Sequence, residues 1–204
     1  KYNIVILGCG VNNEEACHIP IASQKTHDHD INTTRIRKMA HLRNLYVNYI
    51  SKNLSNWDYM AVWDLDMTSK LFLDGVAHNV FLLESDLEVS GVCSYGAYRF
   101  LNNQLYYDTY AHISEGEVWG GYTNKLKHDA RLRKDLNKSP DSKPFKCESC
   151  FGGFVIYRIG DILHSNSIYS TNDQLPCEHV PFNMSLPGKM LSNPGSVHYI
   201  NKND

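Results

Sequence analysis

The chain has 204 residues, of which 42% are hydrophobic and 21% charged, and its formal net charge is -2. This length and composition suit one globular domain with a proper core. The near-neutral charge argues against a nucleic-acid binder with a broad basic face, and no apolar run approaches membrane-spanning length. Because Lys1 is not an initiator methionine, we expect residues 1–204 to be one domain of a longer protein.

The first predicted strand covers residues 2–7 and leads into a loop that contains glycine. Gly8 and Gly10 either let the backbone approach a bound nucleotide or simply turn the chain. Both readings stay open, because a third glycine and the downstream acidic residue of a dinucleotide-binding fingerprint are missing. Gly8 is therefore a candidate cofactor-binding residue.

Residues 33–50 have the pattern of an amphipathic helix. The apolar stripe, with spacings of three, four and seven, consists of Ile36, Met39, Ala40, Tyr46, Val47 and Ile50. Arg43 falls on the same stripe. A guanidinium on a buried face needs an anionic partner, either an internal carboxylate or a bound phosphate, unless its stem packs and its head reaches solvent.

An acidic pair follows the predicted central strand. Residues 57–70 read WDYMAVWDLDMTSK, in which Asp64 and Asp66 stand one residue apart after an apolar run. Side chains alternate along a strand, so both aspartates should point to the same side where the strand ends. Ligands of open α/β sheets bind beyond the carboxyl ends of the strands, so the pair predicts a site for a divalent cation that holds a diphosphate. The alternative is that the pair caps the next helix together with Thr68 and Ser69.

A helix over residues 74–83, a strand over residues 89–94 and an aromatic hairpin are predicted next. The two hairpin stretches are GAYRF and QLYYDTYA, separated by LNN. Asp108 lies in the second stretch, where it either contacts a sugar or forms hydrogen bonds within the hairpin. Residues 114–146 are polar and charged, which predicts a long loop that folds over a substrate.

Residues 145–158 form a second β-rich run. In it, Gly152 and Gly153 either permit close approach of the backbone to a ligand or make a β-bulge. The last fifty residues look irregular and contain the polar clusters Cys177-Glu178-His179 and His198-Tyr199. Neutral imidazole often joins carboxylates around a manganese-type ion, so either His179 or His198 could be a further metal ligand, and His198 is preferred, with a surface histidine as the alternative.

The six cysteines leave the redox state open. Cys147 and Cys150 form a CxxC motif, which Cys177 and His179 would complete as a zinc site, although a disulfide or buried thiols suit the spacing better. Sequons for N-glycosylation fit a luminal protein, and they begin at Asn32, Asn53 and Asn183.

Taken in order, several segments resemble metal-dependent glycosyltransferases of the GT-A fold. They are TRIRKMAHLRN before the central strand, DLD at its end, and then YYDTYA, SCFGGFVIY, CEHV and NPGSVHY. Within that group the chain is most similar to giant-virus collagen glycosyltransferases and fungal capsule-associated mannosyltransferase-like proteins. The resemblance spans most of the chain and implies an α/β fold, a GT-A-like Rossmann-type mixed sheet flanked by helices in a single domain.

The resemblance also implies a hexosyltransferase that moves a sugar from a nucleoside diphosphate to a hydroxyl group. Asp64, Asp66 and His198 would hold Mn²⁺ or Mg²⁺, and Glu178, or else Asp108, would take the proton of the acceptor. The candidate residues around the donor nucleotide are Gly8, Arg43, Asn44, Asp64, Gly152 and Gly153. The expected donor is UDP-glucose and the expected acceptor a galactosylhydroxylysine of a collagen-like protein, with GDP-mannose and a polysaccharide as the alternative. Such an enzyme would work in the lumen of the secretory pathway or in a virus-infected host cell.

One segment departs from the pattern of this family. Only residues 10–32 separate the first strand from the Arg43 helix, where this fold ordinarily has a helix, a second strand and an acidic turn, so a loop is missing or the nucleotide half is reduced.

Two further readings accompany the glycosyltransferase reading. An apolar strand followed by DLDMT is also typical of haloacid-dehalogenase-type phosphatases, in which Asp64 would attack phosphorus and Asp66 would act as acid and base. A catalytically inactive binder of sugar nucleotides would share every motif.

Overall fold

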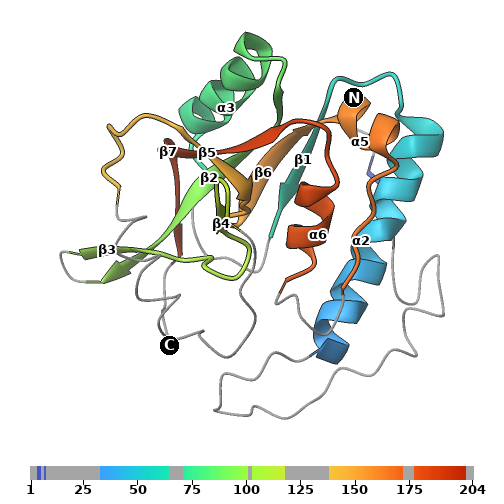
Figure 1. The fold of residues 1–204 in the computed structure, drawn as a ribbon, viewed down its shortest axis with the longest axis horizontal. Coiled ribbons are helices and arrows are strands. Elements are labelled where there is room, and N and C mark those ends of the chain that lie inside the picture. Colours follow the sequence, from blue (N-terminus) through green and yellow to red (C-terminus); the bar gives the residue numbers. More distant parts are fainter. Residues whose placement is uncertain are drawn as a thin grey trace.

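The computed structural model describes residues 4, 5, 7, 33–64, 71–100, 103–117, 138–171 and 177–200. Together they form one mixed α/β unit around a seven-stranded sheet (Figure 1). The strands are β1 (Tyr59–Trp63), β2 (Val89–Phe100), β3 (Asn103–Tyr106), β4 (Ile113–Ser114), β5 (Phe145–Ser149), β6 (Phe154–Arg158) and β7 (Lys189–Ile200). The helices are α2 (Thr33–Asn53), α3 (Leu73–Ser85), α5 (Ile159–Ser165) and α6 (His179–Met184). In these ranges no helix is long and apolar enough to cross a membrane.

The strand directions determine which segments meet at one end of the sheet. The order is β1-β6-β2-β7-β5-β4, and β3 pairs with β2 outside this path. Both β1 and β2 pair antiparallel with β6, and β7 pairs parallel with β2. β1, β2 and β7 therefore run in the same direction, so their carboxyl ends lie beside the start of β6.

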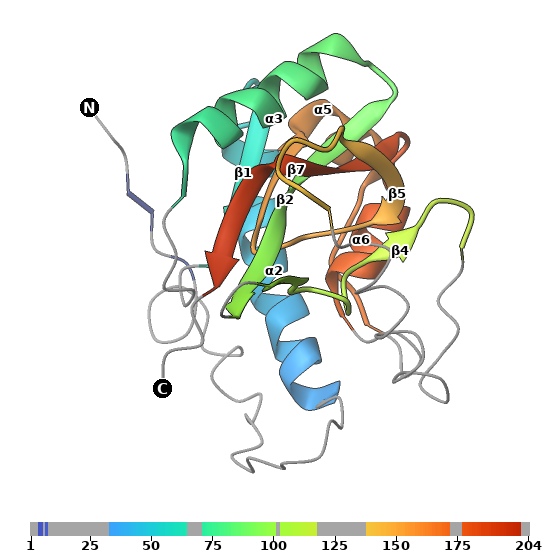
Figure 2. The same cartoon turned by 90° about the vertical axis from the view of Figure 1, so that its left-hand side faces the viewer.

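Helices cover both faces of the sheet, because the strands alternate between two apolar surfaces. Figures 1 and 2 show α3 on one face and α2 and α6 on the other. The core on the α3 side is formed by Leu83, Val89, Val92, Phe154, Ile156 and Leu191. The core on the other side includes Ala40 and Val47 of α2, Met60 and Val62 of β1, Cys93 of β2, and Phe182 of α6.

The local predictions that rest on periodicity agree with the structure. The amphipathic helix is present as α2, and its predicted stripe is buried or half-buried throughout. The second helix is α3, and the aromatic hairpin is the β2–β3 pair, with Phe100 opposite Asn103 at its tip. The mixed α/β class follows directly, since each of these elements packs on the same sheet.

Four other expectations were wrong, incomplete or only partly described. The β-rich run over residues 145–158 is two strands, β5 and β6, which lie apart in the sheet and are separated by Gly152 and Gly153. The last fifty residues are not irregular, since they supply α5, α6 and the inner strand β7. The predicted strand over residues 89–94 continues to Phe100. Of the first predicted strand only residues 4, 5 and 7 are described, and these are in no strand.

Candidate functional site

Arg43 joins two carboxylates that come from distant parts of the chain. Its Nε donates to Glu178 Oε1 at 2.8 Å, and its Nη2 donates to Asp64 Oδ1 at 2.9 Å. The guanidinium also lies over the rings of Phe151 and Tyr169, 5.4 and 5.7 Å from their centroids. The Arg43 side chain is only 8% exposed, so both ion pairs are shielded from solvent on its side.

Each member of this group is positioned by its own element. Arg43 lies on the buried stripe of α2, and Asp64 is the first residue after β1. Glu178 directly precedes α6. The sequence allowed an internal carboxylate or a bound phosphate as the partner of Arg43, and in the structure the partners are internal carboxylates. Burial alone would lower the pKa of Arg43, but neighbouring groups that include both carboxylates raise it, and the guanidinium stays charged.

Asp108 is the third carboxylate of this region. It follows β3, and its side chain accepts hydrogen bonds from the backbone N–H groups of Ala111, at 3.3 Å, and of Gly152. Burial raises the pKa of Asp108 to about 7, these two hydrogen bonds oppose the shift, and the charges of Asp64 and Glu178 add to it. Among the described residues, three carboxylates thus act on one another, and Arg43 pairs with two of them, so these four side chains have more negative than positive groups. We call the group formed by Arg43, Asp64, Asp108 and Glu178 the acidic cluster.

The turn that contains Gly152 and Gly153 contacts both β2 and the backbone of Asp64 in the acidic cluster. Gly152 and Gly153 have φ values of 63° and 84°, in the region that L side chains rarely adopt. A Cβ on Gly152 would collide with the backbone oxygen of Ser94 and approach Gly96 N at 2.9 Å. The Asp64 N–H donates to Gly153 O at 3.1 Å. The sequence predicted a close approach of the backbone at this pair. Among the described residues, the backbone of Gly152 comes close to β2, and Gly153 O binds the backbone N–H of Asp64.

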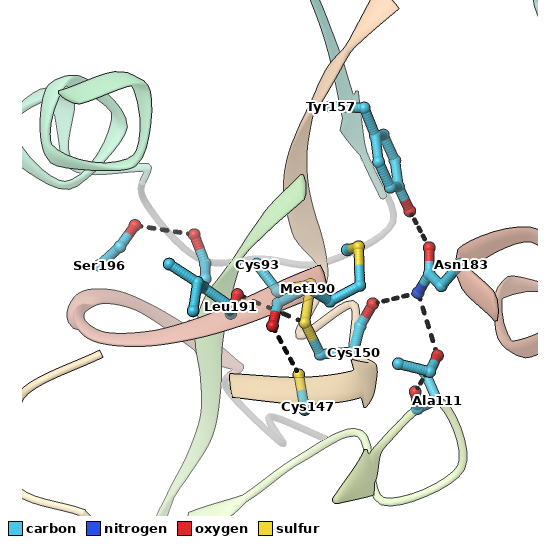
Figure 3. Close-up of a disulfide and its surroundings, with 11 residues drawn as sticks. Cys93, Ala111, Cys147, Cys150, Tyr157, Asn183, Met190, Leu191 and Ser196 are labelled. Atoms are coloured by element: carbon cyan, nitrogen blue, oxygen red, sulfur yellow. Dashed lines mark hydrogen bonds between the residues drawn. A yellow bond between two sulfur atoms is a disulfide. The ribbon is translucent and has the colours of Figure 1, made fainter. Parts of the chain in front are cut away.

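A disulfide between Cys93 and Cys150 ties the start of this turn to β2 (Figure 3). Both cysteines are fully buried. The bond excludes a zinc site at the CxxC motif, because Cys150 bonds to Cys93 and Cys147 keeps a free thiol. Burial raises the pKa of the Cys147 thiol, so this cysteine is an inert core residue.

The predicted metal ligands are described in part. Asp66 lies outside the described residues, as does the predicted nucleotide contact Gly8. His198 is fully buried near the end of β7, next to Gly96 in the strand register, and its ring meets Trp63 edge-on at 6.4 Å. Burial lowers the pKa of His198, which favours the neutral imidazole that binds metals.

Asp64 and His198 therefore both lie at the carboxyl end of the parallel strands, at the ends of β1 and β7. The Asp64 side chain is 28% exposed and offers the oxygen donors that Mn²⁺ and Mg²⁺ prefer. Among the described residues, no group of three His, Cys, Asp or Glu side chains is arranged to hold a metal ion. The donor types fit a divalent cation, and the complete ligand set stays a prediction because it includes Asp66.

Asn44 has a structural role that its sequence position did not reveal. Its Nδ2 donates to Tyr169 O at 2.7 Å, and its Oδ1 accepts from the Tyr169 N–H at 2.8 Å. Both ends of the amide thus hold the segment after α5 against α2. Through this contact Asn44 fixes the aromatic ring that lies over Arg43.

Sequence reasoning also missed the aromatic surroundings of Arg43. His179 is 1% exposed, stacks on Phe151 at 3.8 Å between ring centroids and meets Tyr169 edge-on at 5.3 Å. Burial and then the charge of Arg43 hold the pKa of His179 well below its usual range, so its ring is neutral. The sequence signal for this residue was its place in CEHV. Phe151 lies in SCFGGFVIY in the same way, whereas Tyr169 gave no signal beyond being aromatic.

A groove of about 590 Å³ lies away from the acidic cluster. It is lined by residues of the loop before β2, of β5, α5 and α6, and of the start of β7, and by none of the predicted site residues. Three of its charged groups have partners within the protein: Lys189 Nζ lies 3.3 Å from Glu148 Oε1, and Asp161 accepts from the Ser90 hydroxyl at 2.6 Å.

No protein-family model matches this chain, and no curated protein matches it significantly. The resemblance to glycosyltransferases consequently stays a prediction, and the acidic cluster is the feature from which a function can be inferred.

Proposed function

We propose that this chain is a metal-dependent glycosyltransferase with a GT-A-like Rossmann-type sheet, which moves a hexose from a nucleoside diphosphate to a hydroxyl group. The observation that carries the proposal is the acidic cluster at the carboxyl end of the parallel strands. Ligands of open α/β sheets bind at this end. A site with more carboxylates than cationic side chains suits a substrate whose diphosphate is accompanied by a divalent cation.

In this proposal Asp64 belongs to the cation site together with Asp66 and His198. The bound Mn²⁺ or Mg²⁺ would neutralise the diphosphate as it leaves the sugar. Arg43 holds one oxygen of Asp64 at 2.9 Å, which orients the carboxylate before any ligand arrives. A ligand that is oriented in advance loses less freedom on binding, so Arg43 is a positioning residue for Asp64.

We assign the proton acceptor to Asp108 in preference to Glu178. Glu178 is 6% exposed and its Oε1 is bound by Arg43, so its charge is already used within the protein. Asp108 is half-buried, and its pKa of about 7 lies near neutral pH, where a general base is most effective. Glu178 then holds Arg43 in position. Asp108 takes the proton of the acceptor hydroxyl while the oxygen of that hydroxyl forms its bond to the sugar. This order reverses the one expected from the resemblance.

The choice of substrates follows the resemblance. The proposed donor is UDP-glucose, and the proposed acceptor is a galactosylhydroxylysine on a collagen-like chain. A GDP-mannose-dependent enzyme with a polysaccharide acceptor would use the same cluster in the same roles. These alternatives differ in the donor, so one assay separates them.

The test is release of nucleoside diphosphate from a panel of sugar nucleotides, with and without Mn²⁺. Wild type is compared with Asp64→Asn, Asp66→Ala and Asp108→Asn, and with Glu84→Gln as the matched control, since Glu84 is an exposed acid on α3. We expect Mn²⁺-dependent release from one donor, abolished in the two metal-site variants. Loss of the base in Asp108→Asn should lower the rate by roughly 100-fold or more. The control should match the wild type.

Two results would overturn the proposal. Hydrolysis of a generic phosphoester without release from any sugar nucleotide would establish the phosphatase reading, with Asp64 as nucleophile. Binding of a sugar nucleotide without turnover of any donor or phosphoester would identify a catalytically inactive binder. The ion pair between Asp64 and Arg43 argues against the first, because a paired carboxylate is a weaker nucleophile.

A further inference from the structure

We propose that the folded protein carries an N-linked glycan on Asn53 and none on Asn183. This modification is separate from the proposed catalytic activity. It rests on the contrast between two sequons of the same type, one at the surface and one in the core, and on the disulfide, which indicates an oxidising compartment.

Asn53 is the last residue of α2 and is exposed to solvent. Leu54 and Ser55 complete its sequon, and the chain turns there, since the Trp57 N–H donates to Leu54 O at 3.1 Å. The Asn53 amide makes one hydrogen bond, from Nδ2 to Tyr49 O at 2.9 Å, in an exposed position. Water can replace such a bond at little cost, so the amide nitrogen is available for modification.

Asn183 shows the opposite environment. It is 2% exposed, and its Oδ1 accepts from the Tyr157 hydroxyl at 2.8 Å. Its Nδ2 donates to Ser149 Oγ at 3.0 Å and to Cys150 O at 2.7 Å (Figure 3). An amide nitrogen has two hydrogens, and both are used. A glycan on this nitrogen would replace one of these buried hydrogen bonds, so it is incompatible with the hydrogen bonding of the folded state.

The disulfide supplies the second, independent observation. Cys93 and Cys150 are fully buried and bonded, and such bonds persist in secreted proteins and in the lumen of the endoplasmic reticulum. N-glycosylation of exposed sequons belongs to the same compartment. A compartment in which the disulfide forms is thus also one in which the glycosylating enzyme can reach Asn53.

In the transfer, Asn53 Nδ2 forms a bond to C1 of an oligosaccharide carried on a polyisoprenyl diphosphate. The bond between C1 and the diphosphate oxygen breaks and its electron pair leaves with the diphosphate. The displaced proton of Nδ2 passes to a base of the transferring enzyme. No oxidant or reductant is needed.

The attachment site at Asn53 lies away from the acidic cluster. Asn53 lies ten residues after Arg43 on α2, which corresponds to about 15 Å along the helix axis.

The experiment directs the full chain into the endoplasmic reticulum of cultured eukaryotic cells and analyses the soluble, folded product. The readout is the occupancy of the Asn53 peptide and of the Asn183 peptide by mass spectrometry, before and after an endoglycosidase that removes N-linked glycans. Ser55→Ala removes the first sequon, and Ser55→Thr is the matched control that preserves it. Ser185→Ala removes the second sequon while keeping the Asn183 amide. A digest without reductant maps the disulfides in the same sample.

We expect one core glycan on the Asn53 peptide in the wild type, in Ser55→Thr and in Ser185→Ala, and its complete loss in Ser55→Ala. The Asn183 peptide should be unmodified in every folded sample, and Cys93 should be linked to Cys150. An unmodified Asn53 peptide in folded wild type, or a glycan on Asn183 in the folded fraction, would overturn the proposal. Neither result depends on transferase activity, so the two proposals fail separately.

Discussion

Asp108 shows how a single residue of the acidic cluster links function with stability. Its pKa is raised to about 7 from an ordinary value of 3.8, first by burial and further by Asp64 and Glu178. The folded state therefore binds a proton that the unfolded chain has released between these two pH values. Stability linked to Asp108 is fully present below about pH 4 and is lost as the pH rises through 7.

We accordingly predict that Asp108→Asn stabilises the protein at high pH. The amide is neutral and avoids the cost of a charge beside two carboxylates, so unfolding free energy should rise by about 1 to 2 kcal/mol at pH 8, with allowance for partial exposure. At pH 4 the two proteins should differ much less, because Asp108 is then protonated in the folded state and only partly ionised in the unfolded chain. Urea unfolding between pH 4 and 8 measures the difference.

The control for this prediction is Asp58→Asn, a change at an exposed acid. Its difference from the wild type should stay flat across the same pH range. The histidines with lowered pKa, His179 and His198, affect the wild type and both variants alike and cancel in the comparison. An Asp108→Asn protein that is less stable than the wild type at pH 8 would show that the carboxylate is stabilising in its charged form.

At the scale of elements, the turn between β5 and β6 decides how the acidic cluster is assembled. Its glycines allow the chain to lie against β2 while Gly152 and Gly153 supply a donor to Asp108 and an acceptor to Asp64. Gly96 on β2 is part of the same contact, since a Cβ there would lie 2.6 Å from Gly152 O. The packing of this turn against β2, and the positions of Asp64 and Asp108, thus require glycine at these two positions.

Gly152→Ala should therefore destabilise the protein more than a positive φ alone explains. The left-handed conformation costs an alanine roughly 1 to 2 kcal/mol, and the collision with Ser94 O adds to this because the obstacle is backbone. Gly116→Ala is the matched control: its φ is 74°, but nothing lies within 4 Å of the added Cβ. Chemical denaturation of both variants isolates the collision as their difference, and equal losses would contradict the packing of the turn against β2.

At the scale of the whole molecule, the disulfide connects β2 with the turn before β6. Cys93 and Cys150 are separated by 57 residues. Closing a loop of that length removes freedom from the unfolded chain worth about 4 kcal/mol in the chain-entropy description. The same bond anchors the segment that carries Gly152, so it supports the acidic cluster as well as the fold.

We predict that Cys93→Ala/Cys150→Ala lowers the unfolding free energy by about 2 to 4 kcal/mol. Cys177→Ala, which removes a free thiol, should cost less than the paired change. Urea unfolding without reductant compares the three proteins. A double variant as stable as the wild type would show that these cysteines are not bonded in solution.

The sequence by itself determined the elements whose signals are local. The amphipathic α2, the strand that ends just before Asp64 and the hairpin at Phe100 all follow from side-chain periodicity and turn residues within a few positions of one another. The burial of Arg43 also follows, because its place on the helical stripe is fixed by spacing alone. Periodicity is a property of neighbouring residues and does not need the rest of the fold.

The tertiary structure decided what these elements meet. Arg43 binds Glu178, which is 135 residues away in the chain, and no local pattern indicates that pairing. The same holds for the bond from Cys93 to Cys150, and for β7, whose inner position in the sheet contradicted its irregular sequence. Such contacts depend on how separate segments share one core and one end of a sheet. Burial then sets the pKa of Asp108, which the residue type alone leaves near its ordinary value.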